Sequence, residues 1–273
     1  MPTTGLEVRL TEGRERAEVG RFTRTLDEIV RSLREIDRIY LRKGTRATWV
    51  MAGLSQDRQR DELIVRLEAR PRSSERTAED MLKPVEALVT GAARLAEVPE
   101  VPEYFSPTTV GRLGELATPQ EGVQQVSLAP YNGQVGQEVR LTDAIQKNAQ
   151  EAVNPFEISY GSVVGVVEVL GTARKNSLRL NVFEADSRRP IQAYMGSEEA
   201  EQVRQLWLHR VLLGGIIKRN RRGQAIRIDV DRVSQMPEND DGRPSTDELL
   251  GIDPGWLGSR SVDDYLREVR GEG

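Results

Sequence analysis

The stretch from Ile158 to Met236 constrains the fold most, because its apolar residues follow the two-residue period of strands, interrupted by one helical segment. A helix is expected over Ser197–Leu208, where Ser197 is a suitable N-cap and two glutamates follow it. Strands are expected over Gly161–Leu170, Ser177–Phe183, Ile191–Met195, Arg210–Ile217 and Ala225–Val233. The predicted order is therefore three strands, one helix and two strands.

This order of elements resembles that of OB-type (oligonucleotide-binding) barrels. The resemblance implies a five-stranded β-barrel whose loops flank a nucleic-acid groove. A sandwich-like or open curled sheet would have the same order and stays an alternative. Glycines within the strands, at Gly161, Gly165 and Gly214-Gly215, indicate bulges or barrel corners, because no Lys-Ser/Thr pair follows them as in a phosphate loop.

The preceding part of the chain predicts a β-α-β-β-α region. One helix, Glu18–Arg42, has apolar residues on one face, and on its charged face Glu28 lies close to Arg31 and Glu35 close to Arg38. The other expected elements are Gly5–Leu10, Ala47–Leu54, Glu62–Ala69 and the helix Thr77–Glu97. We expect an α+β fold with an α+β domain over 1–154, a barrel module over 155–237, and a linker with an extended helical tail over 238–273. Trp49, Trp207 and Tyr40 are expected in the core.

Charge and composition exclude several classes of site. The net charge of -4 excludes a uniformly basic coat for nucleic acid, although residues 155–237 hold 13 basic and 9 acidic residues. The chain has no cysteine and one histidine, His209, which excludes disulfides and Cys- or multi-His-ligated metals. No spacing of carboxylates singles out an acid–base pair. We therefore expect no enzyme, no catalytic residue, no cofactor and no metal site.

The location is expected to be cytoplasmic. The start, Met1-Pro2-Thr3-Thr4, lacks a signal-peptide pattern, and no apolar run approaches the roughly 18 residues that span a bilayer. No membrane partner is expected.

The tail from Ser245 contains two short helix signals. Ser245 with Glu248, and Ser261 with Asp264, are capping-box patterns, each followed by apolar residues. Helices this short are marginal alone, since about 12–15 residues are needed in water. So much apolar surface behind an acidic linker needs a groove, either on the same molecule or on another protein.

The run DELLGIDPGWLGSRSVDDYLREVRGEG resembles the C-terminal tails of antitoxins encoded beside PIN-domain ribonuclease toxins. The resemblance implies that the tail wraps such a toxin and that Arg267 or Arg270 enters its acidic catalytic pocket. The alternative is that the tail folds back over its own barrel. The residues expected to bind the partner are Leu249, Leu250, Ile252, Trp256, Leu257, Val262, Tyr265, Leu266, Arg267 and Arg270.

Basic residues also gather on the expected inter-strand loops of the barrel. Such loops could contact the phosphates of a nucleic acid, although a solvated hairpin tip or a surface facing the acidic tail would have the same composition. The residues of this alternative site are Arg174, Lys175, Lys218, Arg219, Arg221 and Arg222.

Overall fold

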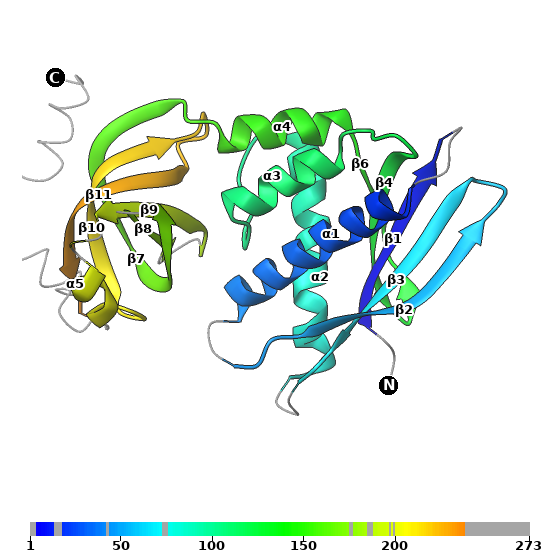
Figure 1. The fold of residues 1–273 in the computed structure, drawn as a ribbon, viewed down its shortest axis with the longest axis horizontal. Helices are drawn as coiled ribbons and strands as arrows, with labels where there is room; N and C mark the ends of the chain where they lie inside the picture. Colours follow the sequence, from blue (N-terminus) through cyan, green and yellow to red (C-terminus); the bar gives the residue numbers. More distant parts are fainter. Residues whose placement is uncertain are drawn as a thin grey trace, which may run out of the picture. The chain divides into compact units, whose positions relative to one another are not determined.

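The computed structural model describes residues 4–13, 18–41, 44–72, 76–174, 177–184, 188–196, 198 and 200–237. The described residues up to Met236 belong to one compact unit with a mixed α/β fold (Figure 1). No helix in this described part combines the length and the apolar character needed to cross a membrane.

An antiparallel sheet covered by helices forms the N-terminal region. The sheet has the strand order β2-β3-β1-β4-β5, with β6 also paired to β4. The elements are β1 (Thr4–Glu12), α1 (Val19–Tyr40), β2 (Thr48–Asp57), β3 (Glu62–Arg70), α2 (Ala78–Glu97), α3 (Pro107–Leu116), β4 (Val123–Asn132), β5 (Gln134–Val135), β6 (Val139–Leu141) and α4 (Asp143–Val153).

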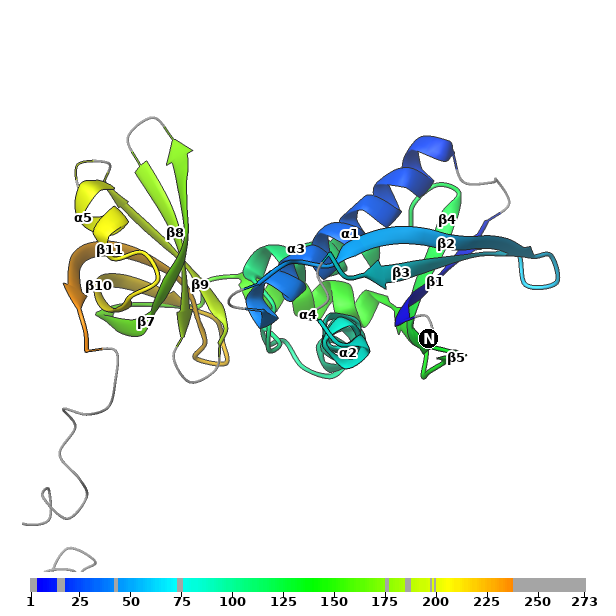
Figure 2. The same ribbon diagram turned by 90° about the horizontal axis from the view of Figure 1, so that it is seen from below.

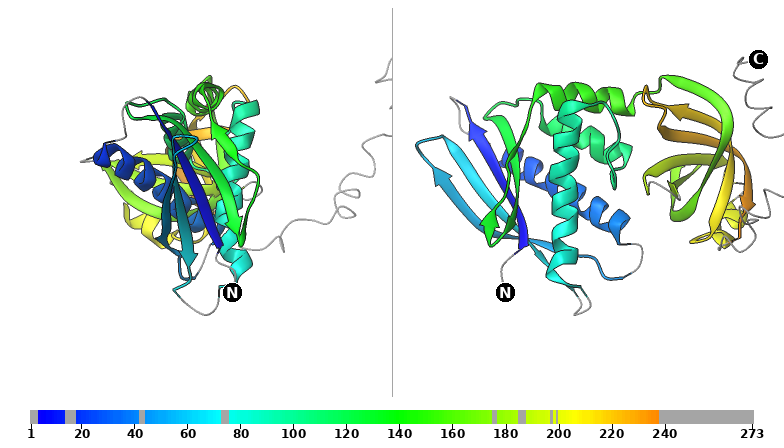
Figure 3. Two further views of the ribbon diagram at one scale, coloured as in Figure 1. Left: turned by 90° about the vertical axis from the view of Figure 1, so that its right-hand side faces the viewer. Right: turned by 180° about the vertical axis from the view of Figure 1, so that it is seen from behind.

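The core of this region lies between the sheet and its helices, which are on one side of it (Figure 3). The two-residue period of β1 turns Leu6, Val8 and Leu10 inward, and all three are fully buried. The 3.6-residue period of α1 turns Leu33 and Ile36 to the same core. Each such side chain contributes roughly 1.5–3 kcal/mol when it is buried.

Five strands close into a barrel in the second half of the chain (Figure 2). They pair in the order β7-β8-β9-β11-β10, and β10 pairs back with β7; only β9 and β11 are parallel. The predicted five-stranded barrel is confirmed, and the sandwich and open-sheet alternatives are wrong. The elements are β7 (Glu157–Arg174), β8 (Ser177–Glu184), β9 (Pro190–Gly196), α5 (Ala200–Gln205), β10 (Arg210–Arg219) and β11 (Ala225–Gln235).

The bulge expected at the strand glycines is confirmed at Gly214-Gly215, whereas β7 pairs with β10 in regular register at Gly161 and Gly165. The pairing of β10 with β11 shifts register between Gly214 and Gly215, and Gly215 has a φ of +155°. A Cβ atom there would lie 2.1 Å from the carbonyl oxygen of Asp229, and one at Gly165 would lie 2.4 Å from that of Phe183. Only glycine allows these backbones to approach so closely.

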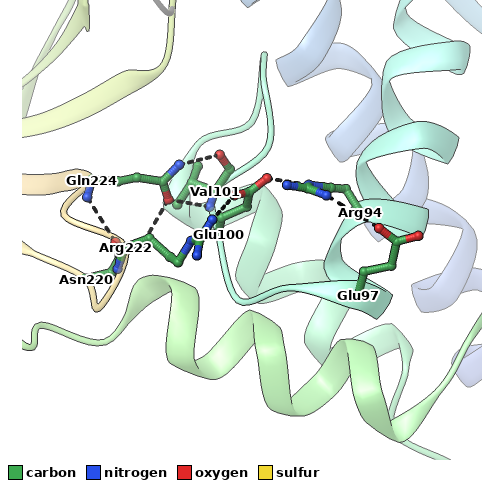
Figure 4. A network of polar contacts seen from close by, with 7 residues as sticks. All are labelled: Arg94, Glu97, Glu100, Val101, Asn220, Arg222 and Gln224. Atoms are coloured by element: carbon green, nitrogen blue, oxygen red, sulfur yellow. Dashed lines mark hydrogen bonds and ion pairs between the residues drawn. The ribbon is translucent and has the colours of Figure 1, made fainter.

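The barrel has a core of its own and is joined to the N-terminal region by polar contacts. The side chain of Gln224 accepts from the backbone N–H of Val101 at 2.7 Å and donates to its carbonyl oxygen at 3.2 Å (Figure 4). Asn220 donates from Nδ2 to the carbonyl oxygen of Ala152 at 2.9 Å. Ile226 of β11 packs in the N-terminal core. These contacts join residues before position 154 to residues after position 155. The domain boundary at 154/155 stays a prediction.

The helix expected over Ser197–Leu208 is shorter than predicted, and Trp207 is not in the core. α5 ends at Gln205, and Trp207 is 52% exposed, with Nε1 donating to the carbonyl oxygen of Glu168 at 3.2 Å. Leu208 has a φ of +67°, so the chain turns there to enter β10. The expectation for Trp49 is confirmed, since it is buried.

Candidate functional site

The cations suggested as a nucleic-acid contact lie only partly on a loop: Lys218 and Arg219 belong to β10, and Arg221 and Arg222 lie between β10 and β11. They have contacts inside the chain. Lys218 forms an ion pair with Asp229 at 3.3 Å, and Arg222 forms one with Glu100 at 3.7 Å (Figure 4). These carboxylates partly neutralise this group.

The other two described cations of this group, Arg219 and Arg221, also have contacts. Arg219 donates from Nη1 to the carbonyl oxygen of Gly223 at 3.0 Å, and the guanidinium of Arg221 lies 4.9 Å from the ring centre of Phe156. Two of the four cations therefore have a carboxylate partner among the described residues, and Arg219 and Arg221 have contacts that carry no negative charge.

The remaining residues of the two predicted sites lie outside the part of the chain whose side chains the structure describes. They are the side chain of Arg174, then Lys175, and all the tail residues, namely Leu249, Leu250, Ile252, Trp256, Leu257, Val262, Tyr265, Leu266, Arg267 and Arg270.

A cleft of about 780 Å³ is lined mainly by arginine among the described residues. Its only acidic lining residues in this part of the chain are Asp27 and Glu35. The volume of this cleft is within the range of small-molecule binding pockets. The arginines that line it are Arg31, Arg34, Arg38, Arg46, Arg72, Arg112 and Arg179.

Helix α1 supplies the row of arginines on one wall. Arg31, Arg34 and Arg38 are three and four residues apart, so they project from the same face of the helix. The core-facing side of α1 holds Leu33 and Ile36. Amphipathicity of the helix therefore places its cations at the cleft.

The outer face of β8 and β9 supplies the other wall. Arg179 pairs across the strands with Tyr194, and Asn181 with Gln192, so these four side chains share one face of the barrel. Gln192 donates from Nε2 to Oγ1 of Thr108, a lining residue from α3, at 3.3 Å. The cleft thus contains one basic helix face and one polar barrel face.

The ion pairs on α1 differ from those expected from helical spacing. Arg31 pairs with Asp27 at 2.8 Å, while Arg112 of α3 takes both Glu28 at 3.1 Å and Glu35 at 2.7 Å. The expected contacts of Glu28 with Arg31 and of Glu35 with Arg38 are therefore replaced.

Most of the cleft arginines have no carboxylate partner among the described residues. Arg72 donates to Oγ1 of Thr48, a neutral group, at 2.7 Å. One nitrogen each of Arg38 and Arg46 is buried without a hydrogen-bond acceptor from the described protein. The arginines without a carboxylate partner in this part of the chain are Arg34, Arg38, Arg46, Arg72 and Arg179.

The surroundings of Arg46 disfavour its positive charge. Burial lowers its pKa, and the like charge of Arg38 lowers it further, while the carboxylates of Asp37 and Glu168 act in the opposite direction. A guanidinium stays charged in proteins. The lowered pKa therefore reports an unfavourable charge that an anion would relieve.

A second cavity, of about 680 Å³, offers no such imbalance. It lies beside Tyr40 and Tyr104, and two ion pairs lie within its lining: Lys83 lies 3.4 Å from Glu86, and Arg94 lies 2.6 Å from Glu100. Its described lining has three acidic and three basic residues, which are Glu86, Glu100, Glu103, Lys83, Arg94 and Arg189.

The sequence alone did not reveal the arginine-lined cleft. Its residues come from α1, α3, β8, β9 and three loops, and their proximity depends on how the elements pack. The one local signal is the row Arg31, Arg34 and Arg38 on a single helix face.

Comparisons with known proteins and a search for metal-binding groups add no further assignment. No protein-family model matches the chain, and no curated protein matches it. Within the described residues, no three His, Asp or Glu side chains gather in a way that could hold a metal ion.

Proposed function

We propose that the protein binds single-stranded nucleic acid in the arginine-lined cleft. The proposal is a binding role, without catalysis, in a cytoplasmic protein. The observation behind it is that the cleft borders the outer face of β8 and β9 and contains five arginines without a carboxylate partner among the described residues.

The barrel topology supports this choice of ligand. Counting the barrel strands β7 to β11 as one to five, the closed order is 1-2-3-5-4, with a helix between the third and fourth strands. We interpret this barrel as OB-like. Barrels of that type bind oligonucleotides on the face of strands two and three, which here are β8 and β9.

The chemistry of the cleft also fits a single strand. Arginine binds phosphate through two parallel N–H groups, so the row on α1 suits a backbone with regularly spaced phosphates. Asn181 offers a donor and an acceptor for base edges, while the amide of Gln192 already donates to Thr108 and accepts from the hydroxyl of Tyr194. Tyr194 shares this barrel face without lining the cleft, and the guanidinium of Arg227 lies over its ring, 4.2 Å from the ring centre. Aromatic and arginine surfaces stack with unpaired bases.

The test measures fluorescence anisotropy of labelled 12-nucleotide DNA and RNA strands at several salt concentrations. The double variant Arg34→Gln/Arg179→Gln removes one cation from each wall. We expect an affinity that is weaker on the order of tenfold, and a log–log salt slope smaller by about 0.7 for each phosphate that the variant no longer neutralises.

The matched control is Arg140→Gln/Arg204→Gln, which removes two exposed arginines outside the cleft, 70% and 72% exposed. It has the same net charge as the cleft variant and should bind nearly as the parent does. Equal losses in both variants, or no binding by the parent at low salt, would refute the proposal. A variant with Lys218, Arg219, Arg221 and Arg222 all changed to Gln tests the cations of β10 and the β10–β11 loop, and we expect a smaller loss from it.

We also propose a second function that rests on the tail sequence alone. The apolar and aromatic residues of 245–273 resemble the toxin-binding tails of antitoxins, so the tail is proposed to inhibit a PIN-type ribonuclease. Arg267 or Arg270 would pair with clustered carboxylates, which suit a bidentate guanidinium.

Co-expression with a PIN-domain ribonuclease encoded by the neighbouring gene tests this second proposal. The full chain should restore growth and co-purify with the ribonuclease, and a chain truncated after residue 244 should do neither. Neutralisation by the truncated chain would exclude the tail as the inhibitor.

A further inference from the structure

Four arginines and two carboxylates form a cluster beside one end of the cleft. Arg76 binds Asp37 through both terminal nitrogens, at 2.7 and 3.1 Å, and the side chains of this pair are 4% and 1% exposed. Asp37 also accepts from the backbone N–H of Ala47, a lining residue of the cleft, at 2.9 Å. Arg38 directly follows Asp37 in the chain, and Arg46 directly precedes Ala47.

The barrel contributes the second carboxylate. Glu168 of β7 lies 3.7 Å from Arg188, and Arg188 also donates to the carbonyl oxygen of Ile39 at the end of α1 at 2.8 Å. Glu168 acts electrostatically on Arg46, as does Asp37. The cluster therefore continues from α1 to the barrel wall.

The charges of the cluster do not balance among the described residues. Asp37 is occupied by Arg76, and Glu168 by Arg188. Asp80 also acts electrostatically on Arg76. Arg38 and Arg46 remain as two positive charges with no carboxylate in contact among the described residues. Both of these guanidiniums line the cleft and are half-buried, and each has a buried nitrogen without an acceptor from the described protein.

A half-buried pair of like charges is costly unless a counter-ion lies close to it. Water can accept hydrogen bonds from these nitrogens, but it would leave the two positive charges uncompensated. A ligand with two negative charges and several acceptor oxygens supplies both the hydrogen-bond acceptors and the compensating charge. A phosphate monoester has these properties near neutral pH, whereas an internal phosphodiester of a strand has only one negative charge.

We propose that Arg38 and Arg46 hold a dianionic phosphate monoester at this end of the cleft. Resting on the function proposed above, this group is the terminal phosphate of the bound strand. The rest of the cleft then contacts internal phosphates and bases, and the protein prefers strands that end in phosphate.

The experiment compares three versions of one 12-nucleotide strand, with a 5′-phosphate, with a 3′-phosphate and with hydroxyls at both ends. The full chain should bind one phosphorylated version on the order of tenfold more tightly than the hydroxyl version, since one charge-assisted contact is of that size. Arg46→Gln and Arg38→Gln should each abolish this difference. The cleft variant R34Q/R179Q should weaken all three strands and keep the difference.

Inorganic phosphate alone provides an arm that does not depend on nucleic acid. Phosphate should raise the unfolding temperature of the parent protein more than chloride at equal ionic strength does, and should not do so in R46Q. In phosphate-free buffer R46Q should unfold at the same or a higher temperature than the parent, because it loses a repelling charge. If Arg46 had a purely structural role, R46Q would unfold at a lower temperature than the parent in phosphate-free buffer.

The outcomes separate the two proposals. Equal affinity for all three strands, with no stabilisation by phosphate, overturns the phosphate site while the nucleic-acid proposal stands. Stabilisation by phosphate that R46Q abolishes, without binding of any strand, supports the site and refutes the nucleic-acid function. Stabilisation by phosphate that persists in R46Q and R38Q overturns the site as placed here.

Discussion

At the scale of single residues, tertiary partners decide which charges remain available. Arg112 of α3 takes Glu28 and Glu35, two carboxylates that helical spacing had assigned to cations of α1. Arg38 is left without a carboxylate partner in the described part of the chain for this reason. Helical spacing predicts which side chains are neighbours on a helix, but not which partner from another element replaces them.

The buried pair of Asp37 and Arg76 gives a prediction about stability. Asp37→Asn leaves the guanidinium of Arg76 buried without its counter-charge, which should cost about 3–5 kcal/mol in the free energy of unfolding by urea. The double variant D37L/R76M removes both charges and should regain most of this loss. A single variant as stable as the parent would mean that the pair is solvated.

Gly215 gives a prediction about backbone strain. Gly215→Ala places a Cβ atom 2.1 Å from the carbonyl oxygen of Asp229 at a φ of +155°, so the barrel must shift. We expect a loss of at least about 2 kcal/mol in thermal unfolding.

Gly111 of α3 is the control for this substitution. A Cβ atom there meets nothing within 4 Å, and Gly111→Ala should stabilise the protein by about 0.5–1 kcal/mol. Equal effects at the two positions would contradict the assigned bulge.

At the scale of elements, much of the fold could be predicted from periodicity. The helix expected over Glu18–Arg42 runs over Val19–Tyr40, and four barrel strands lie close to their expected ranges, while β7 extends beyond the expected Gly161–Leu170 at both ends. The end of α5 was missed because the apolar pattern continues through Trp207 and Leu208, while the backbone turns at Leu208 to pair with Val167. The hydrophobic periodicity of a segment does not predict where the backbone must turn to pair with another strand.

The N-terminus of α2 gives a prediction about pH. The backbone N–H and then the hydroxyl of Thr77 lower the pKa of Asp80 from its ordinary value of 3.8. Because this pKa is lower in the folded state, the stabilisation is present above the unfolded pKa and is lost as the pH falls through the folded pKa. Thr77→Ala keeps the N–H and removes the hydroxyl, so the pKa of Asp80 should rise and stability should fall by about 1 kcal/mol.

NMR titration of the Asp80 carboxyl below about pH 5 and thermal unfolding at neutral pH check these two effects. Thr23→Ala on α1 is the control, because the hydroxyl of Thr23 is exposed and contacts no carboxylate in the described structure. An unchanged pKa of Asp80 in T77A would contradict the capping contact.

At the scale of the whole molecule, the candidate site depends on the joining of two folded parts. The sequence predicted both parts but not the cleft, because residues from α1, α3 and the barrel meet only after the parts pack together. The contact of Gln224 with the backbone of Val101 is one of the bonds that join them. The candidate site should therefore be sensitive to substitutions far from the cleft.

Gln224→Ala tests this dependence. The substitution leaves the N–H and carbonyl of Val101 without their side-chain partner and should cost about 1–3 kcal/mol. Hydrogen exchange at Val101 and at 220–224 should accelerate, and strand affinity should fall. Gln59→Ala, at the exposed β2–β3 turn, is the control and should change neither.

Photocrosslinking of a bound 12-nucleotide strand, followed by peptide mass spectrometry, tests the central claim most directly. The account predicts cross-links to α1 around residues 31–38 and to β8 and β9 around residues 179–194. Cross-links confined to residues 218–222, or spread evenly over exposed basic residues, would contradict the cleft as the binding site.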